Sequence, residues 1–437
     1  MTQAAADLEL TSSAVHIHVR HKPACRIEMD VKTNASMVKT ARKNALKAIG
    51  KEVAMPGFRK GKAPEEMILK KFPHEVEKQV HKEVADLAFV AAQKLANIPL
   101  LNNDSPVSFD LKSKAMEEGA EIVFSFETEP TIPSVDRSSF AAKPVARAEV
   151  GEKQIEEAIR QMRFFYARWT PVEDRAIQNG DFIMIDLDTV NGEQTERVFH
   201  HIRFEVSKER MAHWMQKLVE GAKAGDVLEG ISEADETATE AEKAEFKPKN
   251  VRITILKVEQ SALPELDDAF AKKVGAETIE EMKKSIEGIL KQQVEAKALS
   301  DLREQVNDFL IANYPFDLPQ SLVDTEKKHR FGQLAQDPKF KAGWDKMSQK
   351  ERQNLNETIS AESAQAVRIF YLSRQIVRDA QIPVTHQEVQ NEAVAMIQSH
   401  GGKNVEIDQI PKEIYALALS KVILAKAQDY VLEVVQQ

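Results

Sequence analysis

The sequence contains very little cysteine and few aromatic residues. Among its 437 residues Cys25 is the single cysteine, and aromatic residues make up 6% of the chain. One cysteine cannot form an internal disulfide bond, which favours a reducing compartment such as the cytoplasm. No motif marks Cys25 as a nucleophile, so we expect a buried structural thiol. The scarcity of aromatic residues, together with abundant Ala, Lys, Glu and Gln, favours helix over strand.

Long hydrophobic runs are also missing. The N-terminal residues lack an apolar core of secretory-signal length, and no uncharged apolar run is long enough to span a membrane. Hydrophobic residues make up 42% of the chain, charged residues 30%, and the formal net charge is −9. These values predict a folded, strongly hydrated cytoplasmic protein without a membrane partner. The length predicts two to four domains.

The first part of the chain mixes strand and helix patterns. Apolar and polar residues alternate over 26–32, around 107–111 and over 122–126, which predicts strands. Apolar residues at helical spacing predict helices over 36–50, from Pro64 onward and over 75–96. We therefore predict an N-terminal α+β domain over residues 1–132.

The middle of the chain changes from a polar linker to a β-rich region. Residues 133–150 are polar with an extended pattern, and 152–168 have a helical pattern. The turn Asn191-Gly192 is a strong hairpin signal, and apolar residues alternate again from Val251 to Val258. We predict a linker with a connecting helix over 133–169 and a small β-rich domain over 170–260.

The remaining residues, 261–437, have an almost purely helical pattern. The predicted helical segments are 266–311, 319–336, 348–379, 386–400 and 411–435. Their apolar stripes are interrupted by Ala, Gln and Lys, so we expect long arms that bury only part of their apolar surface. Such a surface suits unfolded or partner chains. A closed helical bundle or a homodimer interface fits the same periodicity.

A basic turn stands out on this acidic chain. Residues 57–64 read GFRKGKAP. Between Lys39 and Phe72 there are ten Lys or Arg residues and three Glu, a local net charge of +7. Glycines let the backbone turn tightly and approach a partner, so the pattern predicts a docking loop for a polyanion. The alternative is a solvated basic hairpin between two helices.

Signatures of common catalytic and cofactor sites are missing. The spacing from Gly57 to Gly61-Lys62-Ala63 is one residue short of a phosphate-binding loop and lacks its Ser or Thr. Two groups of histidines, at 16, 18 and 21 and at 200, 201 and 213, have no accompanying pair of cysteines and no helical H-x3-H pair. We therefore expect no metal site, no cofactor, and neither hydrolase nor transferase chemistry.

The turn GFRKGKAP, placed between two helices of an α+β unit, is very similar to the signature loop of the trigger factor family. The resemblance extends over essentially the whole chain. It includes the helix leading to Arg168-Trp169, the β-rich region, the segment from Lys257 to Asp267 and the helical remainder. It implies a multidomain α+β protein with a ribosome-docking domain, a small FKBP-like domain and an extended all-helical chaperone domain.

The resemblance also implies a partner for the loop. The family docks on the large ribosomal subunit beside the tunnel exit, through ribosomal protein and RNA, by a Phe-Arg-Lys that corresponds here to Phe58, Arg59 and Lys60. We include the rest of the loop in the predicted ribosome-binding site, which comprises Gly57, Phe58, Arg59, Lys60, Gly61 and Lys62. Cations for phosphate and an aromatic for apolar contact fit such a role.

The β-rich region resembles FKBP-type prolyl isomerases, whose apolar pocket accelerates rotation about X–Pro bonds. The sequence departs from that pattern, because the family's Ile-Pro-Gly-Phe is replaced by Ala212, His213, Trp214 and Met215. Phe199 lies nearby. The residues that could still line a pocket are Asp186, Phe204, Trp214, Met215 and Val219. The resemblance therefore predicts the domain, and the substitutions predict weakened or lost catalysis.

The leading hypothesis is a cytoplasmic ribosome-associated chaperone that shields nascent and unfolded polypeptides. The alternative is an enzyme, a prolyl isomerase whose flanking domains recruit substrate. A third interpretation is a helical scaffold without client binding. Homodimerisation of the free protein is left open.

Overall fold

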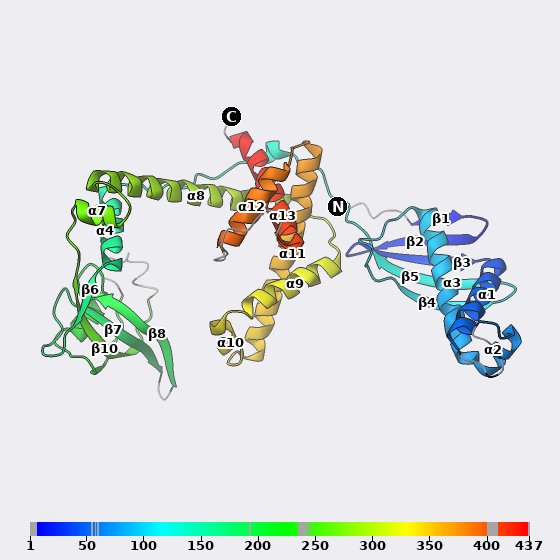
Figure 1. The fold of residues 1–437 in the computed structure, drawn as a ribbon, viewed down its shortest axis with the longest axis horizontal. Helices are drawn as coiled ribbons and strands as arrows, with labels where there is room; N and C mark the ends of the chain where they lie inside the picture. The colour runs from blue at the N-terminus through cyan, green and yellow to red at the C-terminus, as the bar shows by residue number, and fades with distance from the viewer. Residues whose placement is uncertain are drawn as a thin grey trace. The chain divides into compact units, whose positions relative to one another are not determined.

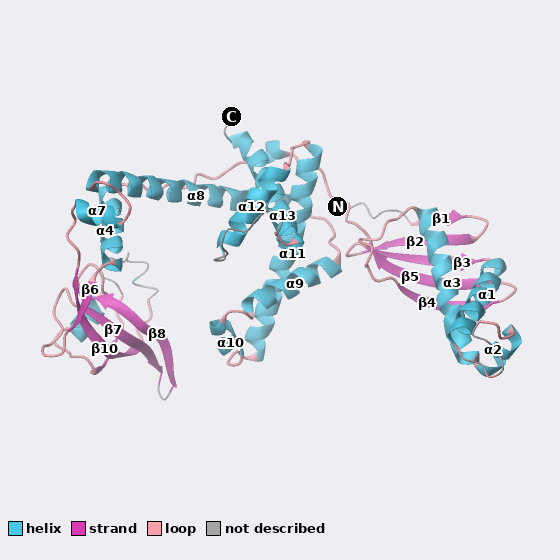
Figure 2. Ribbon diagram, viewed as in Figure 1, coloured by secondary structure: helices cyan, strands magenta, loops and turns pink. Residues whose placement is uncertain are grey.

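The fold was analysed in a computed structural model (Figures 1 and 2). It describes residues 7–435, except 54, 55, 57, 59, 60, 192, 193, 235–242, 244, 245 and 400–409. Contacts divide the chain into two compact units, Met1–Val145 with Ser300–Gln437, and Ala146–Leu299. The predicted domain boundaries, at residues 132, 169 and 260, stay a prediction.

The N-terminal part of the first unit is an antiparallel sheet covered by helices (Figure 2). The strand order is β1-β2-β3-β5-β4. The helices and the sheet enclose one apolar core, to which both contribute. The bounds are β1 Leu8–Thr11, β2 Val15–Lys22, β3 Arg26–Thr33, α1 Ala35–Glu52, α2 Glu65–Lys71, α3 Pro73–Ala96, β4 Ser108–Ala115 and β5 Gly119–Glu127.

Local signals explain these elements. In β3 the alternating Ile27, Met29 and Val31 are all buried, as the pattern predicts. Asn34 caps α1, since its side chain accepts a hydrogen bond from the Met37 N–H at 3.0 Å. Gly119 has φ +107°, and a Cβ there would lie 1.9 Å from the Thr33 carbonyl oxygen, so only glycine fits.

Strand β2 was missed by the sequence analysis. Val15, Ile17 and Val19 are buried on the helix-covered face, with His16 and His18 alternating between them. The alternation of Val15, Ile17 and Val19 is visible in the sequence, but we interpreted the histidines between them only as candidate metal ligands. His16 instead lies 3.0 Å from Glu9, and His18 is 3.7 Å from both Asp7 and Asp30.

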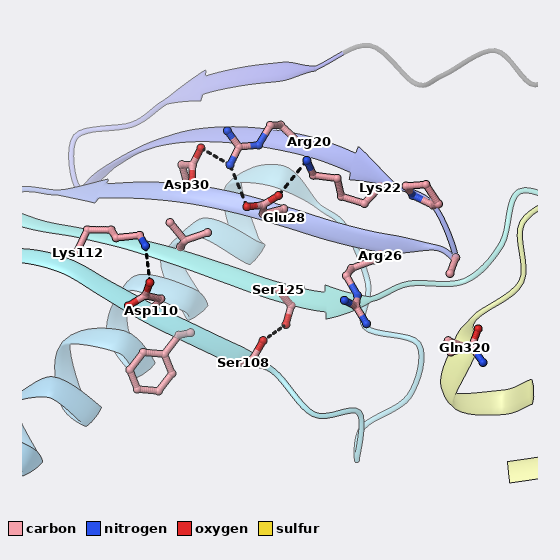
Figure 3. Close-up of a pocket in the computed structure, with 14 residues that line it drawn as sticks. Arg20, Lys22, Arg26, Glu28, Asp30, Ser108, Asp110, Lys112, Ser125 and Gln320 are labelled. Carbon is pink, nitrogen blue, oxygen red and sulfur yellow. Dashed lines mark hydrogen bonds and ion pairs between the residues drawn. The ribbon is translucent and has the colours of Figure 1, made fainter. Parts of the chain in front are cut away.

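The other face of this sheet is charged (Figure 3). Arg20 lies 2.8 Å from Asp30 and 3.2 Å from Glu28, and Lys22 also pairs with Glu28 at 3.2 Å. These groups line an open trough of about 1070 Å³. Since the charges there largely satisfy one another, the trough is explained as the solvated side of a one-layer sheet.

The C-terminal part of the first unit is helical. Helices α11 and α13 pack around a core with the end of α8, and α12 packs on α13 around a smaller core. Phe140, in the segment that contains η1 (Arg137–Ser139), is buried in the larger core. The bounds are α8 Ile279–Asn313, α9 Gln320–Leu334, α10 Pro338–Trp344, α11 Gln349–Asp379, α12 His386–Ser399, α13 Lys412–Leu432 and η3 Glu433–Val435. The short α10 had not been predicted.

The second unit contains a β-sheet with strand order β6-β10-β7-β8, and β9 also pairs with β10. A separate small core joins α4, α7 and the first part of α8. The bounds are α4 Glu152–Phe165, β6 Arg168–Pro171, β7 Phe182–Asn191, β8 Gln194–Glu205, α5 His213–Val219, β9 Val227–Ile231, β10 Asn250–Ala262 and α7 Asp268–Lys273.

The structure corrects two details in this unit. The segment expected as one helix over 266–311 is divided into α7 and α8, with Gly275 at φ +97° between them. The helix expected over 152–168 ends at Phe165, because Arg168 already pairs with Ala262 as the first residue of β6. The predicted hairpin is formed by β7 and β8, although Gly192 lies outside the described residues. Among the described helices, none is long and apolar enough to cross a membrane.

Candidate functional site

The basic loop connects α1 to α2. Gly61 has φ +79°, and its N–H donates to the Gly50 carbonyl at 2.8 Å, which ties the loop back to α1. Pro64 precedes the first residue of α2 and fixes the entry to that helix. Of the predicted docking residues, Phe58, Gly61 and Lys62 are described, whereas Gly57, Arg59 and Lys60 lie outside the described residues.

Apolar and cationic groups are both exposed at this end of the domain. Phe58 is 40% exposed and Met67 is 46% exposed, so two large apolar side chains face solvent here. Met67 lines a shallow hollow of about 350 Å³ with Pro56, Lys70 and Lys71. The loop and the start of α2 therefore present apolar surface bordered by cations.

Helix α1 adds a stripe of lysines. They contribute to the +7 charge found in the sequence, but their position on one face of the helix was not predicted. Lys39, Lys43, Lys47 and Lys51 are exposed and spaced four residues apart, so they lie along one face of the helix. Lys39 pairs with Glu117 at 3.2 Å. Within the part of the chain that the structure describes, the other three lysines of this stripe have no ion-pair partner.

The predicted isomerase-pocket residues lie in two different environments. Met215 and Val219 are buried on α5 in the core of the second unit, and Phe204 and Trp214 pack against that same core. The structure therefore brings these four residues together, and Met215 and Val219 are enclosed in the core. Asp186 instead lies among polar groups of β8.

Asp186 is buried and held by several donors. It accepts a hydrogen bond from the His201 N–H at 2.8 Å and lies 3.1 Å from Arg197 Nη1. Burial opposes ionisation, but the His201 N–H, Arg197, His200 and His201 favour the charged form, so the pKa of Asp186 lies below its ordinary value. Asp186 is therefore a carboxylate at neutral pH.

An aromatic hollow in the second unit was not foreseen as a site. It measures about 480 Å³, and Phe164, Trp169, Phe182 and Phe204 contribute to its walls. The Arg203 guanidinium lies 3.9 Å from the centre of the Trp169 ring. The aromatic pattern around Arg168-Trp169 was visible in the sequence, but the strand pairing that joins it to Phe204 was not.

A second apolar hollow lies at the tip of the α9–α11 hairpin. It measures about 380 Å³ and is walled by Phe331, Phe340 and Trp344, with Ala335 beside them. Phe340 and Trp344 belong to α10, so the helix that the sequence analysis missed supplies most of the aromatic surface. The arrangement matches the expectation that the helical arms expose apolar surface.

Comparisons with known proteins agree at the level of family and fold. Two family models match, "Bacterial trigger factor protein (TF)" over residues 15–162 and "Bacterial trigger factor protein (TF) C-terminus" over residues 278–431. The trigger factor of Protochlamydia amoebophila is 29% identical, and the match covers 95% of both chains. That of Chlamydia pneumoniae is 25% identical, over 97% of this chain and 96% of the relative.

A solved structure is also similar in fold. It comes from "Promiscuous Substrate Recognition in Folding and Assembly Activities of the Trigger Factor Chaperone", with a TM-score of 0.51 and 20% sequence identity, over 95% of this chain and 99% of that one. The predicted fold class, with an α+β first part, a β-rich middle and a helical remainder, is confirmed. The chain belongs to the trigger factor family of ribosome-associated chaperones.

Proposed function

We propose that this chaperone docks on the large ribosomal subunit beside the tunnel exit, through the loop 57–62 and the lysine stripe of α1. The observation that carries the proposal is the exposed Phe58, which is bordered by Lys51 and Lys62, and among the described residues neither lysine has an ion-pair partner. Ribosomal RNA supplies phosphates for such cations, and a ribosomal protein supplies an apolar contact for the ring.

The lysine stripe supports an anionic partner on energetic grounds. Like charges four residues apart on a helix destabilise it by about 0.2–0.5 kcal/mol for each pair. Lys43, Lys47 and Lys51 form two such neighbouring pairs without an internal counterion among the described residues, whereas Glu117 offsets the charge of Lys39. Phosphates bound along this face would remove that repulsion and release counterions.

We further propose that the helical arms shield apolar segments of nascent chains. The hollow between Phe331, Phe340 and Trp344 is apolar and open, and α8 and α13 expose further large residues, among them Ile289 and Leu417. Exposed apolar surfaces of this kind mark sites that bind apolar segments of other chains. The same surfaces could pair two free molecules, and sedimentation velocity at several concentrations tests homodimerisation.

A prolyl isomerase role receives little support from the second unit. Met215 and Val219 are 5% and 0% exposed, so they act as core residues rather than as an open wall for a substrate proline. We expect proline-limited refolding of a model substrate to proceed at the uncatalysed rate when the full chain is added. A large acceleration would instead favour the enzyme alternative.

The docking proposal is tested by changing Phe58, Arg59 and Lys60 to Ala together. The variant should keep the circular dichroism spectrum of the parent but lose co-sedimentation with isolated large subunits at moderate salt. The parent protein should pellet with large subunits and be released at high salt. Equal pelleting of the two proteins would contradict the proposal. The cytoplasmic location that it requires agrees with the unpaired Cys25.

A further inference from the structure

The hairpin of β7 and β8 contains an irregularity that gathers three possible metal ligands. The strand register shifts around Asp186, since Ile185 pairs with Ile202 while Leu187 pairs with Phe199. Two residues of β8, His200 and His201, therefore lie opposite the single residue Asp186. This two-against-one arrangement is a β-bulge.

The backbone of the bulge turns both imidazoles toward Asp186. Neighbouring side chains on a regular strand point to opposite faces of the sheet. His201 has φ +53°, a left-handed conformation uncommon for a residue other than glycine. The distortion brings the His200 and His201 rings to 4.0 Å between centroids, with both Nδ1 atoms on the same carboxylate. Bulges often re-aim side chains for a function.

The three ligand atoms have the spacing of a metal site. His200 Nδ1 and His201 Nδ1 are 3.0 Å apart, and they lie 3.1 Å and 3.5 Å from Asp186 Oδ1. A tetrahedral zinc ion with bonds of about 2.0–2.1 Å holds its ligand atoms about 3.3 Å apart. The three distances therefore lie around the ligand spacing of a tetrahedral zinc site.

We propose that Asp186, His200 and His201 bind a divalent transition metal ion of the zinc class. Two imidazoles and one carboxylate suit zinc and its neighbours in the first transition row. The side chains of His200 and His201 are 61% and 55% exposed, so the ion reaches the site from solvent and keeps an open position for water. The buried Asp186 fixes the inner side of the site.

The surrounding groups fit this assignment. The His201 N–H donates to Asp186 Oδ1 at 2.8 Å, and Arg197 lies 3.1 Å from Asp186 Oδ2 and 2.8 Å from Asp188 Oδ1. These contacts orient the ligand carboxylate as outer partners do in metal sites. Arg197 Nη1 also lies 3.2 Å from His200 Nδ1, where it donates to the lone pair that the metal ion would take, so metal binding replaces this hydrogen bond while the two carboxylate contacts of Arg197 remain. Asp186, Asp188 and Arg197 together carry a net charge of −1, which favours a cation.

The competing explanation is a metal-free contact between neutral rings. Two imidazolium rings do not fit, because both Nδ1 atoms would direct hydrogens at each other across 3.0 Å. One neutral ring donating to the other would fit. The two explanations differ in whether zinc binds, and in whether loss of one ring changes that binding.

The test is isothermal titration calorimetry of the metal-stripped full chain with zinc chloride. We expect one zinc ion bound with micromolar or tighter affinity, and a visible ligand-field absorption when cobalt(II) replaces zinc. His200→Ala and His201→Gly should each weaken zinc binding at least tenfold. Glycine tolerates the positive φ of His201, so His201→Gly removes a ligand while it preserves the bulge.

A matched control removes two histidines elsewhere. His16→Ala with His18→Ala, on β2, should leave zinc affinity within twofold of the parent. The proposal is overturned if the parent binds zinc no more tightly than millimolar. It is equally overturned if His200→Ala and His201→Gly, both folded by circular dichroism, bind zinc as the parent does.

Discussion

At the scale of single residues, the groups that surround Asp186 indicate a role that the sequence did not predict. Asp186 looked like a pocket residue in the sequence, but the structure surrounds it with Arg197, His200 and His201. The sequence could not show this grouping, because adjacent histidines on a strand are expected on opposite faces. Only the left-handed backbone at His201 brings them together.

Cys25 offers a prediction at the same scale. Burial, with the nearby Asp317 and Glu127 carboxylates, raises the pKa of the Cys25 thiol to about 12, and Sγ donates to the Asp317 carbonyl at 3.1 Å. The thiolate is the reactive form, so at pH 8 iodoacetamide should alkylate Cys25 more than about a hundredfold more slowly than an exposed cysteine of ordinary pKa. Mass spectrometry over time measures the rate.

The control for Cys25 is the unfolded chain. In urea the pKa should return to its ordinary value near 8.5, and alkylation should become fast. Because the folded thiol has the higher pKa, its contribution to stability is complete below pH 8.5 and is lost as pH rises toward 12. Cys25 is half-buried rather than fully buried as expected, and equal alkylation rates in buffer and in urea would contradict the raised pKa of its thiol.

At the scale of elements, periodicity predicted the long helices and the buried strands β3, β5 and β10, whereas β2 and short elements such as α10 were not predicted. The segments expected at 319–336, 348–379 and 386–400 correspond closely to α9, α11 and α12. Helix α10 has seven residues, too few to display a helical period, and its position depends on packing against Phe331. Tertiary contact, rather than local pattern, defines it.

The lysine stripe of α1 gives a prediction for an element. Lys43→Glu with Lys47→Glu should weaken binding to large subunits at least tenfold at low salt. The plot of log affinity against log salt should also lose roughly two units of slope, about one for each phosphate contact. Fluorescence anisotropy across a salt series measures both quantities.

Helical stability should not fall in that variant, since each new Glu gains an oppositely charged neighbour four residues away, Lys39 or Lys51. The matched control is Lys283→Glu with Lys284→Glu on α8, where both lysines are exposed and the charge change is the same. Equal loss of binding in the two double variants would show a general charge effect instead of a docking face.

The arm tip gives a second element-scale prediction. Phe340→Ser with Trp344→Ser removes most of the aromatic wall of the hollow between α9 and α10. Suppression of the aggregation of a chemically unfolded client, followed by light scattering, should need several times more of this variant. Phe165→Ala, at an aromatic that is 84% exposed on α4, should behave as the parent. Unchanged suppression in the arm variant would assign client binding elsewhere.

At the scale of the whole molecule, the basic docking stretch and the apolar hollow of the arm are separated along the chain. The chain carries −9 overall, yet the stretch from Lys39 to Phe72 carries +7 by ten Lys or Arg against three Glu. The apolar hollow of the arm lies among residues 331–345, far from that stretch in sequence. A chaperone that binds a polyanionic particle and an apolar client at once requires this separation.

The order of the α+β, β-rich and helical parts was predictable because each has its own composition and its own spacing of apolar residues. The loop GFRKGKAP then indicated their functions through its resemblance to a known family. What the sequence could not supply was the pairing of distant strands, such as β6 with β10, that builds the aromatic hollow around Trp169. Nor could it show that Met215 and Val219 are enclosed in the core.

The docking of this loop on the ribosome is tested most directly by photo-cross-linking from position 58. A benzoylphenylalanine placed at Phe58 keeps an aromatic ring at an exposed position. Illumination with ribosomes should give adducts to a protein or RNA of the large subunit, and high salt or excess unlabelled chain should suppress them. The account would be contradicted if the probe at position 58 gave no large-subunit adducts, or if the same probe at the exposed Phe165 gave them in equal yield.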